Sequence, residues 1–111
     1  MDLPSPNQRP NPSTPMNLAI DYDDTWTKDP YLWDTFVGIA LHRGHQVFIA
    51  TGRSERDELV AGFDVPRGIR VIYCDRDYKE QVLLRHGIKI DVWIDDSPGC
   101  IQQTKILGGE L

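Results

Sequence analysis

Cysteine and long apolar segments are the features that this sequence lacks most clearly. Its 111 residues include two cysteines, Cys74 and Cys100, which form no paired metal-ligand motif, and no apolar run approaches the length of a membrane span. Nothing resembles a secretory signal. We therefore expect a protein of the reducing cytoplasm that has no membrane partner.

Positive charge is also scarce. The chain has 12 Lys and Arg residues against 17 Asp and Glu residues, and its formal net charge is −5. This balance disfavours a broad basic surface for nucleic acid or for an anionic membrane. Acidic residues that gather at one edge of the predicted fold instead indicate a divalent cation. The histidines His42, His45 and His86 are scattered, and we interpret them as surface or helix-end residues.

Prolines crowd the first residues of the chain, where they alternate with polar residues. Such a composition cannot bury enough apolar surface to order itself, which predicts a disordered tail over residues 1–15. The remaining length suits one folded domain over residues 16–111.

Apolar strand-like segments and helical segments alternate through this domain. Expected strands cover residues 16–21, 46–50, 69–73 and 91–95, and expected helices cover residues 29–43, 54–62, 77–86 and 97–107. Alternation of this kind predicts a three-layer, Rossmann-like α/β fold with a parallel sheet of about four strands. On the first helix, we expect the buried face to consist of Leu32, Phe36, Ile39 and Ala40.

Polar residues follow three of the four predicted strands. They are Asp21 with Asp23, Thr51 with Arg53, and Asp95 with Asp96. In an open parallel sheet, ligands bind beyond the carboxyl ends of the strands, so we expect these residues to converge on one crevice.

The Asp21 and Asp23 side chains should point to the same side, with Cα atoms about 7 Å apart. Two carboxylates so close repel each other unless a cation, a shared proton or a reaction uses them. The alternative is an Asx-type turn formed by Asp23 and Asp24, and this stretch alone leaves both interpretations open.

A phosphate ester held through Mg²⁺ would suit such an edge. Mg²⁺ takes oxygen ligands and is usually bound through one or two carboxylates and the substrate phosphate. Asp21 and Asp95 would be direct ligands, and Asp96 would act through water. Lys79 and the backbone N–H groups after Thr51 would offset the negative charge of the phosphate.

A carboxylate can also be the nucleophile of such a reaction. Asp21 lies at the strand end and is the natural candidate to form an aspartyl-phosphate. Asp23 would protonate the leaving oxygen and then deprotonate the attacking water. Thr51 would donate a hydrogen bond to the phosphoryl group.

Four motifs together resemble those of the haloacid dehalogenase (HAD) superfamily. They are Asp21-x-Asp23-x-Thr25, Thr51, an isolated Lys79 that opens a helix, and Asp95-Asp96, and the resemblance spans about residues 17–107. It implies a magnesium-dependent phosphatase with Asp21 as nucleophile and metal ligand. It also implies Asp23 as general acid/base whose backbone carbonyl binds the metal, Thr51 as phosphate ligand, Lys79 as neutraliser, and Asp95 and Asp96 as metal-site acids.

Within the superfamily, the chain is most similar to the 3′-phosphatase domain of phage polynucleotide kinase. The matching segments are Thr51-Gly52-Arg53, Lys79-Glu80 and Ile94-Asp95-Asp96. This resemblance implies that Thr51, Gly52, Arg53 and Lys79 bind the substrate phosphate, and that a nucleotide or a polynucleotide 3′-phosphate is a candidate substrate. The chain has no long insertion that would form a cap domain, so the crevice should be open.

Other functions and simpler roles stay open at this stage. A non-catalytic module that binds Mg²⁺ or phosphate is one alternative. An acidic receiver domain is another, although here the paired acids follow the fourth strand rather than the first. Lys79 could be a solvated helix lysine, and Arg53 could pair with Glu55 or Asp57.

Several further side chains receive simple structural interpretations. We interpret Trp33 as a staple between a loop and the first helix, and Cys100 as a small core residue. Trp26 and Tyr31 flank the mouth of the crevice and could stack on a base. Asp24 should face solvent, and Asp96 could belong to a helix cap with Ser97.

Overall fold

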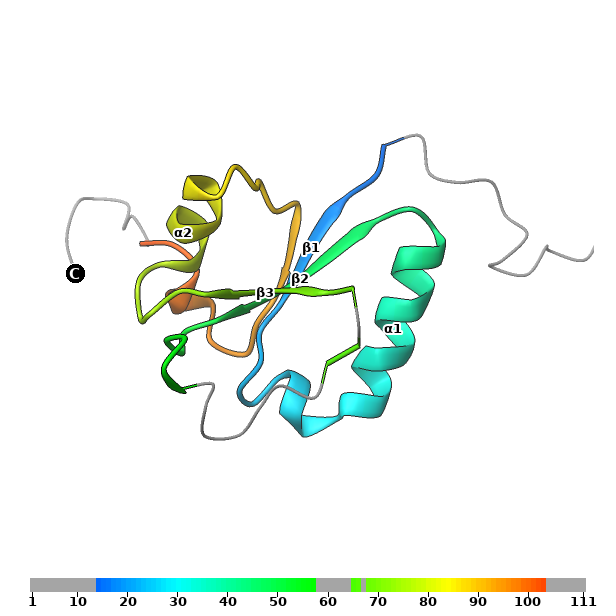
Figure 1. Ribbon diagram of the computed structural model, residues 1–111, viewed down its shortest axis with the longest axis horizontal. Helices are drawn as coiled ribbons and strands as arrows, with labels where there is room; N and C mark the ends of the chain where they lie inside the picture. The colour runs from blue at the N-terminus through cyan, green and yellow to red at the C-terminus, as the bar shows by residue number, and fades with distance from the viewer. Residues whose placement is uncertain (1–13, 58–64, 67, 104–111) are drawn as a thin grey trace, which may run out of the picture.

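The computed structural model describes residues 14–57, 65–66 and 68–103 (Figure 1). Within these ranges the strands are β1 (Asn17–Ile20), β2 (Gln46–Thr51), β3 (Arg70–Tyr73) and β4 (Val92–Ile94). The helices are α1 (Pro30–His42) and α2 (Lys79–Arg85), with short 3-10 turns η2 (Trp26–Lys28) and η4 (Pro98–Cys100). Each predicted strand is confirmed to within two residues at either end.

The four strands form one parallel sheet in the order β3-β2-β1-β4, which confirms an α/β architecture compatible with a Rossmann-like fold. The chain steps outward from β1 to β3 and then crosses to the other side of β1 for β4. Ile20 lies opposite both Ile49 and Ile94, so the carboxyl ends of β1, β2 and β4 lie at about the same level. Ligand crevices in open α/β sheets form where the strand order reverses, and here that point lies between β1 and β4.

Each face of the sheet carries its own hydrophobic core, because successive strand residues point to opposite sides. On one face, Leu18, Ile20, Val47 and Ile49 pack with Val37 and Ala40 of α1. On the other face, Ala19, Phe48, Ala50 and Ile72 pack with Val82 and Leu83 of α2. Figure 1 shows the two helices on opposite sides of the strands.

Helix α1 begins as the sequence predicts but buries a different face. The Asp29 carboxylate accepts the backbone N–H of Leu32 (3.1 Å), and Pro30 is the first helical residue. Leu32 and Ile39 are about half exposed, which makes their predicted burial wrong. Val37 and Ala40 are buried instead, with Trp33 and Phe36 packed against them.

Trp33 anchors this buried face of α1 to the loop that follows β1. Its indole N–H donates to the backbone carbonyl of Thr25 (2.9 Å), and its ring meets Phe36 edge to face with centroids 6.0 Å apart. The helix therefore turns its Trp33 side toward the loop that follows β1. The interpretation of Trp33 as a staple is confirmed.

The bounds of the predicted helices agree with the structure less well than those of the strands. Helix α2 begins at Lys79 rather than at residue 77, and the helix expected over 97–107 is represented by the single turn η4. Cys100 in that turn is exposed, so its predicted place in the core is wrong. The expected tail over residues 1–15 lies almost wholly outside the described residues, as do much of the helix expected over 54–62 and the last residues of the final one. None of the helices in the described ranges has the length and apolar character needed to cross a bilayer.

Candidate functional site

The carboxyl ends of β1, β2 and β4 open into a cleft of about 440 Å³, which is in the size range of small-molecule sites. Most of the predicted site residues line it. The lining consists of Asp21, Asp23, Asp24, Gly52, Arg53, Asp57, Arg76, Lys79, Asp95, Asp96, Ser97 and Cys100. Thr51 is the predicted site residue that does not line the cleft, because it is fully buried at the end of β2.

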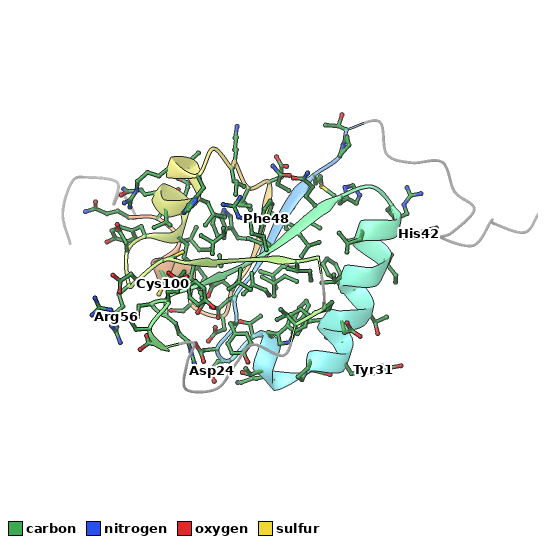
Figure 2. The ribbon with its side chains drawn as sticks, in the orientation of Figure 1. Asp24, Tyr31, His42, Phe48, Arg56 and Cys100 are labelled. Atoms are coloured by element: carbon green, nitrogen blue, oxygen red, sulfur yellow. The ribbon has the colours of Figure 1, made fainter. Side chains whose placement is uncertain are left out.

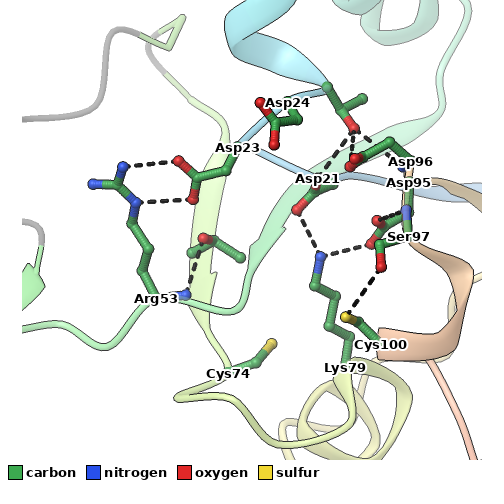
Figure 3. A network of polar contacts seen from close by, with 12 residues as sticks. Asp21, Asp23, Asp24, Arg53, Cys74, Lys79, Asp95, Asp96, Ser97 and Cys100 are labelled. Atoms are coloured by element: carbon green, nitrogen blue, oxygen red, sulfur yellow. Dashed lines mark hydrogen bonds and ion pairs between the residues drawn. The ribbon is translucent and has the colours of Figure 1, made fainter.

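Lys79 forms the buried centre of this site (Figure 3). Its Nζ atom lies 2.7 Å from Asp21 Oδ1 and 2.6 Å from Asp95 Oδ2, and the residue is 3% exposed. The alternative of a solvated helix lysine is therefore wrong. Burial opposes the charge of Lys79, but the hydrogen bonds to the two carboxylates outweigh it, so the pKa of Lys79 is raised.

Asp21 is held through both of its carboxylate oxygens. Burial raises its pKa to about 6, although the hydrogen bond and the charge of Lys79 act in the opposite direction. Its Oδ2 atom lies 3.1 Å from the hydroxyl of Thr25, and that hydroxyl also lies 3.0 Å from Asp96 Oδ1. The hydrogen bonds of Asp96 with Asp21 and Thr25 lower the pKa of Asp96. Thr25 therefore links β1 to the loop after β4.

Sequence reasoning did not assign this linking role to Thr25. The residue is buried, and besides its two carboxylate contacts its hydroxyl accepts the backbone N–H of Asp96 (3.2 Å). The sequence did point to Thr25 as a site residue, because Thr25 is the last position of the Asp21-x-Asp23-x-Thr25 motif.

Three acids at this end of the cleft could hold a metal ion. Oxygen atoms of Asp21, Asp95 and Asp96 all lie within 4.8 Å of one another. Hard carboxylate oxygens are ligands that Mg²⁺ accepts. With Lys79 included, three negative charges and one positive charge leave −2, which matches a divalent cation. The donor set therefore fits the predicted magnesium ion.

Asp23 takes a different partner from the other acids. Arg53 forms a two-pronged ion pair with it, with Nη2 2.8 Å from Oδ1 and Nε 2.9 Å from Oδ2. The guanidinium also lies over the ring of Tyr22, 5.6 Å from its centroid. The hydrogen bond with Asp23 raises the pKa of Arg53. The alternative pairing of Arg53 with Glu55 or Asp57 is wrong, and the carboxylate of Asp23 is not among the three that could hold a metal.

The residues after β1 form a turn as well as a site. Thr25 N–H donates to Tyr22 O (3.4 Å), and Asp24 adopts a left-handed backbone with φ of 63°. Asp24 is exposed, as predicted. The prediction that Asp21 and Asp23 point to the same side is wrong, because the turn directs Asp21 toward Lys79 and Asp23 toward Arg53 (Figure 3). A turn at these residues and a role in a site are therefore compatible.

The loops after β2 and β3 are joined through their backbones. Cys74 N–H donates to Thr51 O (2.8 Å), Asp75 N–H to Arg53 O (3.2 Å) and Arg76 N–H to Gly52 O (2.8 Å). The Thr51 hydroxyl accepts the N–H of Arg53 (3.2 Å). These bonds bring Arg76, which sequence reasoning missed, to the lining of the cleft. The signal was a polar Asp75-Arg76-Asp77 segment directly after a predicted strand.

The aromatic residues predicted at the mouth of the crevice do not line the cleft. Trp26 is 2% exposed and belongs to the core. Tyr31 is 82% exposed and extends away from α1 at the edge of the molecule (Figure 2). The suggestion that they stack on a base bound in this cleft is wrong.

Comparison of the chain with protein-family models, curated proteins and solved structures found no significant match. The function is therefore inferred from the chemistry of the described residues.

Proposed function

We propose that this protein is a Mg²⁺-dependent phosphomonoesterase of the HAD type, with a capless, three-layer fold, that works in the cytoplasm. The observation that carries the proposal is the buried contact of Lys79 with both Asp21 and Asp95, next to Asp96. A cation that bridges carboxylates from the first and last strands holds those strand ends in one place. This arrangement supports the proposal, because it places preorganised charge at the sheet edge where ligands of parallel sheets bind.

The magnesium ion would be held by Asp21, Asp95 and Asp96, with the backbone carbonyl of Asp23 as a further expected ligand. When bound, it neutralises negative charge on the phosphoryl oxygens. Lys79 adds a fixed positive charge in a poorly solvated position, where electrostatic effects are strong.

Asp21 is the proposed nucleophile. One of its carboxylate oxygens attacks phosphorus while the ester P–O bond breaks, which gives an aspartyl-phosphate and an alcohol after Asp23 supplies a proton to the leaving oxygen. A water molecule then attacks the phosphoryl group as Asp23 takes its proton, and this releases phosphate and restores the Asp21 carboxylate. Lys79 and Thr25 hold the Asp21 carboxylate by opposite oxygens, which fixes its direction.

Arg53 connects substrate binding to the state of Asp23. In the structure the guanidinium occupies both carboxylate oxygens of Asp23, which keeps them from a leaving oxygen. A substrate phosphate offers the guanidinium another two-pronged partner. Transfer of Arg53 to the phosphate would free Asp23 for proton transfer.

The same pair favours a second candidate function. If Arg53 stays on Asp23, the site binds Mg²⁺ and phosphate without turnover, as a non-catalytic binding module would. Both candidates take a phosphate monoester as ligand, including a nucleotide or a phosphorylated nucleic-acid end.

Phosphate release from an aryl phosphate in the presence of Mg²⁺ separates the two candidates. We expect turnover by the unaltered protein and a loss of at least about 10³-fold in Asp21→Asn, because the nucleophile is removed. Asp34→Asn on the exposed surface of α1 makes the same chemical change away from the cleft and should retain activity. Mg²⁺ and phosphate binding without turnover would support the binding module. Absence of both turnover and Mg²⁺ binding would contradict both candidates.

A further inference from the structure

Arg76 lines the cleft, yet the reaction proposed above does not use it. It lies in the loop between β3 and α2, on the side of the cleft that also carries Arg53. Lys79 is occupied by Asp21 and Asp95, and Arg53 is occupied by Asp23. None of the ion pairs found among the described residues involves Arg76. The nearby acid Asp57 responds to its charge, which contributes, after the hydrogen bonds of Ser54, to the lowered pKa of Asp57.

The backbone that presents Arg76 is unusual. Asp75 and Arg76 both have left-handed backbone angles, with φ of 50° and 62°. Side-chain-bearing residues rarely adopt this conformation, because the Cβ atom crowds the neighbouring carbonyl. Two in succession persist only where surrounding bonds enforce them, and such strain is concentrated at ligand-binding loops.

Backbone hydrogen bonds enforce the conformation here. The N–H groups of Asp75 and Arg76 donate to the carbonyls of Arg53 and Gly52, and Asp77 N–H donates to Cys74 O (2.9 Å). The backbones of the two loops are therefore joined directly. Arg76 is thus held at a fixed place relative to Arg53, the expected phosphate ligand.

We propose that Arg76 binds a second phosphate group of the substrate. The preferred substrate would then be a phosphomonoester that carries another phosphate on the same molecule. This inference rests on the proposed function, which places the reacting phosphoryl group between Arg53 and the three metal-site acids. The cleft is much larger than one phosphate group, and an arginine side chain suits the two-pronged recognition of phosphate oxygens. The second group could be the diester of an oligonucleotide or the second monoester of a small nucleotide, which share this chemistry.

Three substrates distinguish these possibilities. They are a nucleoside 3′-monophosphate, a nucleoside 3′,5′-bisphosphate and a dinucleotide with a 3′-terminal phosphate, with kcat/KM for phosphate release measured in Mg²⁺. We expect the unaltered protein to prefer at least one of the two substrates that carry a second phosphate group to the monophosphate by about tenfold. Preference for the bisphosphate identifies a small nucleotide as the source of the second phosphate, and preference for the dinucleotide identifies a nucleic-acid end.

Variants at Arg76 test whether this residue causes the preference. In Arg76→Gln the ratio of kcat/KM values should fall from about ten to about one, and Arg76→Lys should keep an intermediate ratio. Arg70→Gln is the matched control, because Arg70 is an exposed arginine at the opposite end of β3. The proposal is overturned if Arg76→Gln keeps the ratio of the unaltered protein.

Equilibrium binding keeps this test separate from the test of catalysis. If no substrate is turned over, the phosphatase proposal fails, and calorimetry with Mg²⁺ then compares inorganic phosphate with the nucleoside bisphosphate. Tighter binding of the bisphosphate that is lost in Arg76→Gln supports the role of Arg76 in a binding module. Equal affinity of the unaltered protein and of Arg76→Gln for the bisphosphate overturns that role.

Discussion

Charges on the two sides of the cleft are held in different ways. On the buried side, formed by Asp21, Lys79 and Asp95, the three side chains are 9%, 3% and 2% exposed. On the open side, which carries Asp23 and Arg53, the paired side chains are 47% and 31% exposed. Arg76, on the loop joined to that of Arg53, is also exposed. Both sides contain carboxylates in contact with a cationic side chain, so the difference between them is solvation.

This difference determines what each side can do. A buried ion pair is weakly screened and costly to disrupt, so its geometry is fixed before a ligand arrives. A pair open to water has little net energy, so its members can exchange partners at small cost. The buried side suits the reacting atoms, and the open side suits the recognition of a substrate that comes and goes.

Removal of the buried cation should give the largest effect. Lys79→Met keeps most of the side-chain length but leaves Asp21 and Asp95 without their positive partner, and we expect it to lower the free energy of unfolding by about 3–5 kcal/mol. Urea denaturation followed by tryptophan fluorescence measures this change. Arg85→Met breaks an exposed ion pair with Asp77 and should cost at most about 1 kcal/mol. Equal losses in the two variants would remove the distinction between buried and open pairs.

Titration of Asp21 should give the next effect. Folding raises its pKa from 3.8 to about 6, so over this interval the folded state binds more protons than the unfolded state. The contribution of Asp21 to stability is therefore greatest at low pH and is lost as the pH rises through 6. Mg²⁺ needs the carboxylate, so its affinity should rise about tenfold between pH 5 and pH 7.

The increase in melting temperature caused by Mg²⁺, measured at the two pH values, tests this expectation. Asp95→Asn should abolish the stabilisation, and EDTA should reverse it in the unaltered protein. Asp24→Asn is the matched control, since Asp24 is not among the three acids that could hold a metal. A Mg²⁺ affinity that is equal at pH 5 and pH 7 would show that Asp21 is not a ligand.

The open side should respond in activity more than in stability. We expect Arg53→Gln to lower the free energy of unfolding by less than about 1 kcal/mol, because the pair is half exposed. Loss of a two-pronged phosphate contact should lower kcat/KM by about 10- to 100-fold, mainly through KM, since each factor of ten is about 1.4 kcal/mol. Denaturation and steady-state kinetics of the same preparation test both parts. A loss of stability as large as that expected for Lys79→Met would contradict the prediction, because the Arg53 pair would then behave as a buried ion pair.

The smallest effect is expected from chemical labelling of the two cysteines. Cys100 lines the cleft and is exposed, whereas burial of Cys74 raises its pKa to about 11. At pH 8 one thiol per molecule should react with an alkylating reagent, and mass spectrometry should place the label on Cys100. Bound Mg²⁺ and phosphate should slow that reaction. Rapid labelling of Cys74 in the folded protein would contradict the burial.

The meeting of Asp21 with Asp95 could be predicted from sequence, because it follows from backbone rules. A parallel sheet sends the carboxyl ends of its strands to one edge, so residues that follow apolar strands meet there. Lys79, which opens α2, was predicted on another basis, namely the positive charge that a bound phosphate needs and the resemblance to the HAD motifs. The burial of each group could not be predicted, since it depends on how the loops and α2 close over the strand ends.

Backbone rules do not predict which side chains on different loops form ion pairs. For Arg53 the sequence offered a substrate phosphate or, as the alternative, an acid nearby in sequence as partner. In the structure its partner is Asp23, which lies 30 residues away on another loop. The proposed role of Arg76 depends on left-handed backbone angles at Asp75 and Arg76, and neither residue is a glycine, the residue type that would have predicted such angles. The buried face of α1 was misplaced because the segment carries a second apolar stripe at helical spacing. That stripe, formed by Trp33, Phe36, Val37 and Ala40, faces the sheet, and Trp33 also donates a hydrogen bond to Thr25.

The central place of β1 has a consequence for the order of refolding. This strand pairs with β2 and with β4. The N–H of its first residue, Asn17, donates to the Asp91 carboxylate, and the N–H of Asp91, 74 positions further along the chain, donates to the Asn17 carbonyl. Contacts between such distant segments form slowly, because a long loop must close first. Competence to bind a cation should therefore appear only when β4 docks beside β1, because that pairing brings Asp95 and Asp96 to Asp21.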